Sequence, residues 1–161
     1  MNVVLFQPEI PPNTGSVARL CAATRTRLHL IEPLGFEIDD RHLKRAGLDY
    51  WPHVDLHVHG SWEEFTGRHA GARLLYFSKK AARTYVSAEF REDDFLVFGP
   101  ETRGLPESLL NANQARCYVI PMMSPAVRSL NLANAVSIVL YEGLRQLGRL
   151  QPAPFEPERF D

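Results

Sequence analysis

The sequence predicts an α/β fold in which a mostly parallel sheet is flanked by helices. Two observations carry this prediction: short apolar runs rich in β-branched and aromatic residues alternate with helical patterns, and the runs are apolar at consecutive positions, with His29 as the exception. Continuous apolar runs indicate strands that are covered on both faces, as in parallel sheets. The 161 residues, 45% of them hydrophobic and 23% charged, are enough to build one core and predict a single globular domain.

Five apolar runs are expected to form the strands. They are residues 3–6, 28–31, 74–77, 95–98 and 118–120. All of them are far shorter than the roughly 20 apolar residues that a membrane-spanning helix needs, so we expect no contact with a membrane.

The helices are expected in the segments between and after these runs. They are residues 14–24, 39–46, 61–68, 106–111 and 129–147. Two prolines precede the first helix, and we expect Asn13 or Thr14 to cap it. Gly148 is expected to end the last helix, whose apolar surface is wider than one sheet contact requires. A second copy of the chain is therefore expected to cover part of that helix.

The last residues, the net charge, the first residues and the two cysteines limit the kinds of protein that this sequence can be. Residues 1–150 are expected to form the domain and residues 151–161 a proline-rich acidic tail, since its prolines cannot continue a helix. The formal net charge of −1 excludes a protein that attracts nucleic acid by bulk charge. The first residues lack the pattern of a secretory signal. Cys21 and Cys117 lie in apolar settings, so we expect reduced, buried thiols in a cytoplasmic protein.

The informative polar residues directly follow the predicted strands, because ligands of open α/β sheets bind beyond the carboxyl ends of the strands. The first such junction, residues 7–15, leads into the helix that carries Arg19. Gly15 and Arg19 share a helix face, and the missing side chain at Gly15 leaves room for the guanidinium to reach the junction and bind an anion or a ribose. Pairing of Arg19 with a neighbouring carboxylate is an equally good interpretation.

The second junction, residues 98–106, holds two glycines, two prolines, Glu101 and Arg103. Glycine directly after a buried strand allows the backbone to approach a ligand closely, although a simple turn with local ion pairs explains the same pattern. The segment has neither a phosphate-binding P-loop nor a dinucleotide fingerprint, which counts against a plain nucleotide-binding enzyme.

The third junction, residues 120–135, places Arg128, Ser129 and Asn131 at the expected start of the last helix. Capping of that helix accounts for one of these polar side chains but does not require all three. Part of this polarity is therefore interpreted as functional.

Together, the three junctions and residues 41–50 resemble the motifs of the SPOUT class of RNA methyltransferases, in the TrmH-like branch of ribose 2′-O-methyltransferases. The similarity is greatest to the enzymes that methylate the wobble nucleotide of tRNA. It extends from Met1 to about Gly148, and several motifs in the same order are more specific than any one of them.

This resemblance implies a trefoil knot near the C-terminus, S-adenosylmethionine as the methyl donor, a homodimer and a tRNA substrate. It assigns cofactor binding to four positions and catalysis to four others. The cofactor-binding residues are Phe77, Gly99, Ile120 and Ser129, and the catalytic residues are Arg19, Asn13, Glu101 and Asn131. A guanidinium stays protonated, so Arg19 suits a phosphate anchor or a stabiliser of developing negative charge better than a general base.

The resemblance also suggests which basic residues contact tRNA phosphates. The candidates are Arg41, Lys44 and Arg45, together with Lys79, Lys80 and Arg83. The alternatives to a wobble-nucleotide methyltransferase are an enzyme for another tRNA position or for ribosomal RNA, and a non-catalytic RNA-binding or assembly module.

His53, His57 and His59 form a cluster in the sequence, and the last two share one strand face. No cysteine or acidic residue follows them at ligand spacing, so the pattern predicts a partly exposed edge strand and no metal site.

Overall fold

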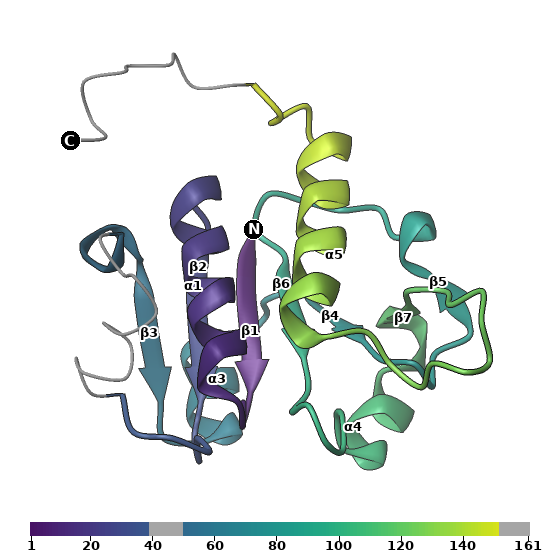
Figure 1. Cartoon of the computed structure of the whole chain (residues 1–161), viewed down its shortest axis with the longest axis horizontal. Helices are drawn as coiled ribbons and strands as arrows, with labels where there is room; N and C mark the ends of the chain where they lie inside the picture. Colours follow the sequence, from purple (N-terminus) through teal and green to yellow (C-terminus); the bar gives the residue numbers. More distant parts are fainter. Residues whose placement is uncertain (39–49, 152–161) are drawn as a thin grey trace.

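In the computed structural model, which describes residues 1–38 and 50–151, the strands form one sheet in the order β3-β2-β1-β6-β4-β7-β5 (Figure 1). All neighbouring strands in this sheet are parallel. The strands are β1 (Asn2–Phe6), β2 (Arg27–Ile31), β3 (Leu56–His59), β4 (Leu74–Phe77), β5 (Arg83–Thr84), β6 (Phe95–Phe98) and β7 (Cys117–Val119). The predicted fold class and its five strands are confirmed.

The two edge strands differ in how well the sequence indicates them. β3 is the edge strand expected from the histidine pattern, and it pairs only with β2 among the described residues. β5 was not predicted, because a strand of two residues has no periodic pattern to detect.

The described helices are α1 (Pro11–Thr24), α3 (Trp62–Arg68), α4 (Glu107–Ala112) and α5 (Leu132–Gln146). Short 3₁₀ turns cover Trp51–His53, Tyr85–Ser87 and Gln114–Arg116. The helix expected at residues 39–46 and the tail at 152–161 lie outside the described residues.

The first helix begins three residues before the predicted start, and the expected cap at Asn13 or Thr14 is wrong. Its N-cap is Ile10, whose side chain has no polar atom. Pro11 and Pro12 occupy the first turn, where proline is well tolerated because the N–H groups of that turn have no partner within the helix.

The last helix begins at Leu132, three residues after the predicted start, because Asn131 is its N-cap. The Asn131 side-chain oxygen accepts hydrogen bonds from the backbone N–H groups of Ala133 and Asn134. At the other end, Gly148 has a φ of +66° and ends the helix as predicted.

Both faces of the sheet are covered by helices, which explains why the strands are apolar at consecutive positions. On one face, Val3 and Leu5 of β1 pack in the same core cluster as residues of α1 and α5. On the other face, Val4 and Phe6 pack with residues of α3 and α4. Figure 1 shows α1 and α5 side by side on the near face of the sheet.

The two cysteines are free and buried, as predicted, and burial raises the pKa of the Cys21 thiol to about 12. None of the helices within residues 1–38 and 50–151 combines the length and the apolar character needed to cross a membrane.

Candidate active site at the carboxyl ends of the strands

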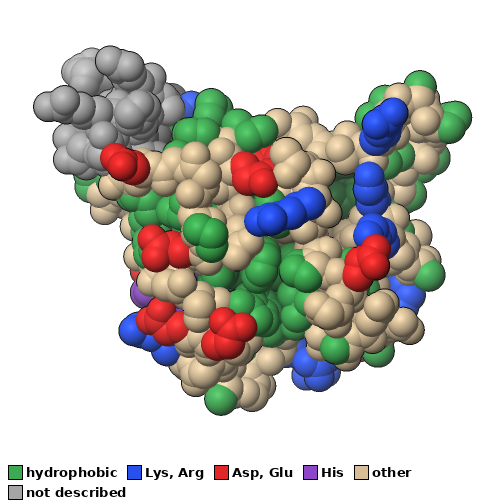
Figure 2. Space-filling model, turned by 90° about the horizontal axis from the view of Figure 1, so that it is seen from below, with side chains coloured by type: hydrophobic (Ala, Val, Ile, Leu, Met, Phe, Trp, Pro, Cys, Tyr) green, Lys and Arg blue, Asp and Glu red, His purple; other side chains and the backbone are tan. Residues whose placement is uncertain are grey.

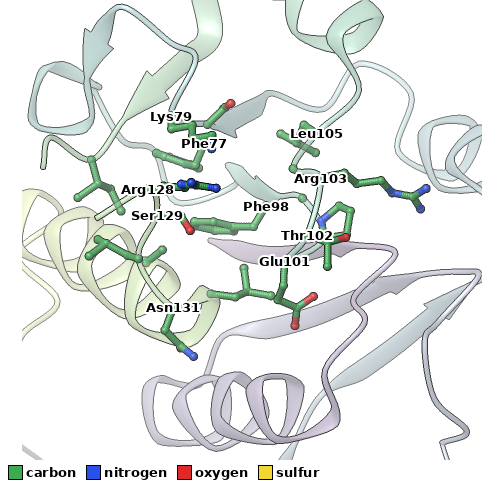
Figure 3. Close-up of a pocket in the computed structure, with 18 of the residues that line it drawn as sticks. Phe77, Lys79, Phe98, Glu101, Thr102, Arg103, Leu105, Arg128, Ser129 and Asn131 are labelled. Atoms are coloured by element: carbon green, nitrogen blue, oxygen red, sulfur yellow. The ribbon is translucent and has the colours of Figure 1, made fainter. Parts of the chain in front are cut away.

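A cavity of about 530 Å³ lies where β4, β6 and β7 end, at the edge of the sheet that the sequence predicted (Figure 3). Seven of the eight site residues named from the sequence line this cavity. They are Phe77, Gly99, Ile120, Ser129, Asn13, Glu101 and Asn131. They come from four separate segments, and the parallel sheet brings these segments to one place.

The inner part of the cavity is apolar. The rings of Phe77 and Phe98 are stacked with their centroids 5.0 Å apart, and Leu105, Ile120 and Leu132 add aliphatic surface. Figure 3 shows Arg128 and Ser129 on the same side of the cavity as these two rings. The cavity therefore combines a flat apolar surface with a rim of polar groups, as binding sites for small molecules commonly do.

Gly99 is required by the fold of its own loop. A Cβ atom at this position would lie 2.3 Å from the backbone nitrogen of Leu105 and 2.4 Å from the carbonyl carbon of Gly104. The loop folds back because the Gly104 N–H donates to the Pro100 carbonyl, 2.9 Å away. The sequence suggested that a glycine here allows a ligand to approach closely. The structure shows that the loop itself also requires glycine, whether or not a ligand is bound.

Glu101 joins the second junction to the first. Its carboxylate accepts hydrogen bonds from the backbone N–H groups of Glu9 and Ile10, at 2.9 and 3.2 Å, and from the side-chain amide of Asn13 at 3.1 Å. Ile10 caps α1 without a polar side chain, so Glu101 supplies the negative charge that favours this helix terminus.

Asn13 also connects α1 to α5. Its side-chain oxygen accepts a hydrogen bond of 2.8 Å from the side-chain amide of Asn131. Glu101, Asn13 and Asn131 therefore form a continuous polar chain along the rim, and Figure 3 shows Glu101 and Asn131 directed toward the same side of the cavity. Because each amide both donates and accepts, the orientations of these side chains depend on one another.

A second contact between the first two junctions escaped the sequence reasoning. The Glu9 carboxylate accepts hydrogen bonds from the backbone N–H and the hydroxyl of Thr102, which hold the pKa of Glu9 below its usual range. Glu9 and Thr102 are 93 positions apart, and the sequence offers no signal for such a pair beyond the placement of both at strand ends.

Among the eight cofactor-binding and catalytic residues, all of them described, Arg19 is the one that does not line the cavity. Its guanidinium lies over the ring of Tyr50, 4.7 Å from the centroid, and the Tyr50 hydroxyl donates a hydrogen bond to the Gly15 carbonyl at 3.2 Å. The Arg19 guanidinium thus lies against Tyr50, and Arg19 is not among the residues that line the cavity.

Four basic residues line the cavity, namely Lys79, Lys80, Arg103 and Arg128. Lys80 pairs with Glu107, and Arg103 donates to the side-chain oxygen of Gln7 at 2.9 Å. Figure 2, which looks onto the ends of the strands, shows Lys and Arg side chains concentrated on one half of this face and Asp and Glu mainly on the other.

Of the other predicted tRNA contacts, Arg83 belongs to the described residues and does not line the cavity. Arg83 donates to the Ala115 carbonyl and lies over the Tyr118 ring, 5.0 Å from its centroid. Arg41, Lys44 and Arg45 lie outside the described residues.

The chain is similar to proteins of known class over nearly its whole length. Residues 1–141 match the SpoU rRNA Methylase family. The tRNA (cytidine(34)-2′-O)-methyltransferase of Saccharophagus degradans is 51% identical over 148 residues, which cover 91% of this chain and 96% of the relative. The Escherichia coli protein of the same description is 47% identical, with coverage of 92% of this chain and 94% of the relative.

Solved structures show the same similarity. One that is described as giving insights into the 2-OH methylation of C/U34 on tRNA superposes with a TM-score of 0.86 at 53% identity, covering 91% of this chain and 95% of the other. The SpoU methyltransferase AviRb from Streptomyces viridochromogenes, in complex with AdoMet, superposes with a TM-score of 0.78 at 25% identity, covering 91% of this chain and 57% of the other.

Proposed function

Because the chain belongs to the SpoU rRNA methylase family, we propose that it transfers a methyl group from S-adenosylmethionine to the ribose 2′-hydroxyl of the tRNA wobble nucleotide. The substrate nucleotide is position 34, as a cytidine or a modified uridine, by analogy with the relatives described above. The observation that carries the proposal is the polar chain Glu101–Asn13–Asn131 on the rim of a cavity that also exposes all four expected cofactor-binding residues.

The cavity suits S-adenosylmethionine. Phe77, Phe98 and Leu105 offer apolar surface for an adenine ring, and the backbone on either side of Gly99 is open to the cavity. Ile120 and Ser129 extend the same wall toward α5. When bound, the cofactor would supply an electrophilic methyl group on a sulfonium sulfur for bond formation to the ribose oxygen, with S-adenosylhomocysteine as the other product.

The residues of the chain position the ribose for this transfer. Glu101 holds the first two junctions together, and Asn13 and Asn131 present amide groups that can bind the acceptor ribose. Positioning of the hydroxyl in line with the methyl group supplies a large part of the acceleration in reactions of this kind. Arg19 anchors a neighbouring phosphate and stabilises the negative charge that develops on the ribose oxygen as its proton passes to solvent water.

We further propose that the working unit is a homodimer. Arg19 lies outside the cavity of its own chain, over Tyr50. α1, which carries Arg19, lies beside α5, whose Ile138 and Tyr141 are apolar and exposed. A second copy that covers these side chains would place the Arg19 of one chain near the other chain, so both copies would contribute to each site.

The proposal extends to the domain organisation of the chain, its contacts with tRNA phosphates and its place in the cell. Residues 1–150 act as one domain that binds both the cofactor and tRNA, with the trefoil knot of the family and a short tail at 151–161. Lys79 and Arg128 on the cavity rim attract the phosphates, together with Arg41, Lys44 and Arg45. The protein acts in the cytoplasm, where its tRNA substrate is found.

Methylation mapping tests the proposal directly. The chain is incubated with S-adenosylmethionine carrying a labelled methyl group and with total tRNA from cells that lack wobble 2′-O-methylation. We expect label only on the ribose of nucleotide 34, and none on a tRNA transcript with a 2′-deoxynucleotide at that position. Label at another position or on ribosomal RNA would replace this substrate assignment. Cofactor binding without methylation of any RNA would indicate a non-catalytic module.

A further inference from the structure

A group of three histidines lies at the edge of the sheet away from the cavity. His29 is on β2, His59 is on β3, and His69 directly follows α3. One ring nitrogen from each of these residues can be chosen so that all three atoms lie within 4.8 Å of one another. The topology builds this group from positions that are 30 and 10 residues apart in the sequence.

Two of the three rings are almost completely buried, since His29 is 2% and His59 is 3% exposed. Nδ1 of His29 lies 3.0 Å from Nε2 of His59, so these nitrogens share one hydrogen bond. The other two nitrogens, Nε2 of His29 and Nδ1 of His59, are buried and have no hydrogen-bond partner among residues 1–38 and 50–151. Buried polar atoms without a partner are rare in folded proteins because they lose their hydration without compensation.

The surroundings of these rings are apolar on one side and open to solvent on the other. Phe65 and Phe95 contact the rings from the apolar side, and His69 is only half-buried, which leaves the group open to solvent on one side.

We propose that His29, His59 and His69 bind a divalent transition-metal ion, with Zn²⁺ as the preferred ion and a water molecule in the fourth position. Three imidazole nitrogens with one open position form a common Zn²⁺ coordination set, whereas Mg²⁺ and Ca²⁺ require oxygen ligands. Zn–N bonds of roughly 2.0–2.1 Å place tetrahedral ligand atoms about 3.4 Å apart. The present separations reach 4.8 Å, so the widest of them would need to contract by up to about 1.4 Å, which movement of the half-buried His69 ring can supply.

The ion would join three elements at an exposed edge of the sheet. β3 has a partner strand on one side only among the described residues, and α3 is only seven residues long. A bound ion would connect His59 on the edge strand β3 to His29 on β2 and to His69 at the end of α3. The cavity lies beyond β1, at the ends of β4, β6 and β7, so the ion would lie apart from methyl transfer.

The sequence predicted no metal site here because it compared only His53, His57 and His59. His57 stacks on the ring of His29, but it is exposed and its Nε2 lies 2.8 Å from the Asp55 carboxylate. The two additional ligands come from β2 and from the end of α3, and only the folded chain brings them to His59.

Metal titration of the full-length chain tests the site. The purified protein is treated with a chelator and titrated with Zn²⁺ in a calorimeter, and with Co²⁺, whose visible absorption reports nitrogen ligation and tetrahedral geometry. We expect one ion per chain and a higher unfolding temperature with Zn²⁺ than without it. His69→Ala and His59→Ala are each expected to weaken Zn²⁺ binding at least about tenfold, since each removes one of three ligands.

His57→Ala is the matched control, because it removes a histidine from the same strand face that is not one of the three ligands. It should bind Zn²⁺ as the unchanged chain does. His69 is half-buried, so His69→Ala keeps the test decisive if His59→Ala does not fold. The proposal is overturned if the unchanged chain binds no Zn²⁺, if His69→Ala binds it equally well, or if His57→Ala loses as much affinity as His69→Ala.

Discussion

Glu9 and Glu101 each use their carboxylate to hold the other's loop. Glu101 accepts a hydrogen bond from the backbone N–H of Glu9, and Glu9 accepts hydrogen bonds from Thr102, the residue that follows Glu101. Two like-charged side chains therefore lie close together without a direct contact, because each is satisfied by donors on the opposite loop. This exchange closes the first junction onto the second, at the point where the cavity rim begins.

The first prediction concerns Glu101→Gln, which keeps the size of the side chain but replaces one acceptor oxygen with a donor amide. That amide would face the N–H of Glu9 or the donors at Ile10 and Asn13, so at least one hydrogen bond is lost. We expect the free energy of unfolding to fall by about 1–3 kcal/mol, measured by urea titration. We expect turnover to fall at least about tenfold, because a neutral amide holds Asn13 less firmly than a carboxylate does.

Glu107→Gln is the matched control for this change. Glu107 is exposed and forms a surface ion pair with Lys80. Exposed pairs contribute roughly 0–1 kcal/mol, so both stability and turnover should be nearly unchanged. Equal losses in the two variants would remove Glu101 from its positioning role.

The second prediction separates the close packing at Gly99 from a general effect of replacing glycine. In Gly99→Ala the new Cβ meets backbone atoms at 2.3 and 2.4 Å, so the loop must move. We expect a loss of about 1–3 kcal/mol of stability and weaker binding of S-adenosylmethionine, measured by calorimetry. In Gly67→Ala, in α3, the Cβ meets no described atom within 4 Å, and alanine favours the helix. That variant should be as stable as the unchanged chain or more so, with the same cofactor affinity.

The strand positions and the location of the site could be predicted from the sequence for one physical reason. Parallel strands buried on both faces are apolar throughout, and their carboxyl ends lie at one edge of the sheet. The polar residues after the runs that end at Phe6, Phe98 and Ile120 were therefore expected at the same edge of the sheet. Only the assignment of roles to them depended on the family resemblance.

Apart from the two-residue strand β5, the features that were missed depend on contacts between distant segments. The exchange between Glu9 and Thr102 and the grouping of His29 with His59 and His69 follow from strand order, which local patterns do not determine. The start of α1 was misplaced because Asn13 is a good cap in isolation, whereas here its amide binds Glu101. The hydrogen bond between Asn13 and Glu101 thus outweighs the local preference of Asn13 for capping a helix.

The third prediction concerns Arg19→Ala. Because Arg19 does not line the cavity of its own chain, the variant should bind S-adenosylmethionine as the unchanged protein does. If Arg19 stabilises the developing charge on the ribose oxygen, turnover should fall by roughly 10²–10³-fold. Arg27→Ala serves as the control. Arg27 is exposed at the start of β2 and pairs with Asp55, so its loss should leave turnover unchanged. Full activity in Arg19→Ala would exclude Arg19 from the mechanism.

The fourth prediction concerns thiol reactivity. The reactive form of cysteine is the thiolate, and a pKa of about 12 leaves Cys21 almost entirely protonated at neutral and mildly alkaline pH. Burial also raises the pKa of Cys117. A chromogenic disulfide reagent at pH 8 should react slowly with the native chain and should label two thiols per chain once urea unfolds it. Rapid labelling of both thiols in the native protein would contradict the buried placement.

The fifth prediction concerns the outer face of α5, where Ile138 and Tyr141 are 37% and 47% exposed and lie three residues apart on one side of the helix. In the proposed homodimer these side chains are covered by the second copy, so the double variant Ile138→Glu, Tyr141→Glu would bury two carboxylates and should sediment as a monomer. It should still fold and lose turnover, because Arg19 no longer reaches the partner. Val86→Glu, at a 55% exposed apolar position in the turn Tyr85–Ser87, adds a carboxylate away from α5 and should remain dimeric. An unchanged chain that sediments as a monomer while fully active would rule out a site shared between two copies.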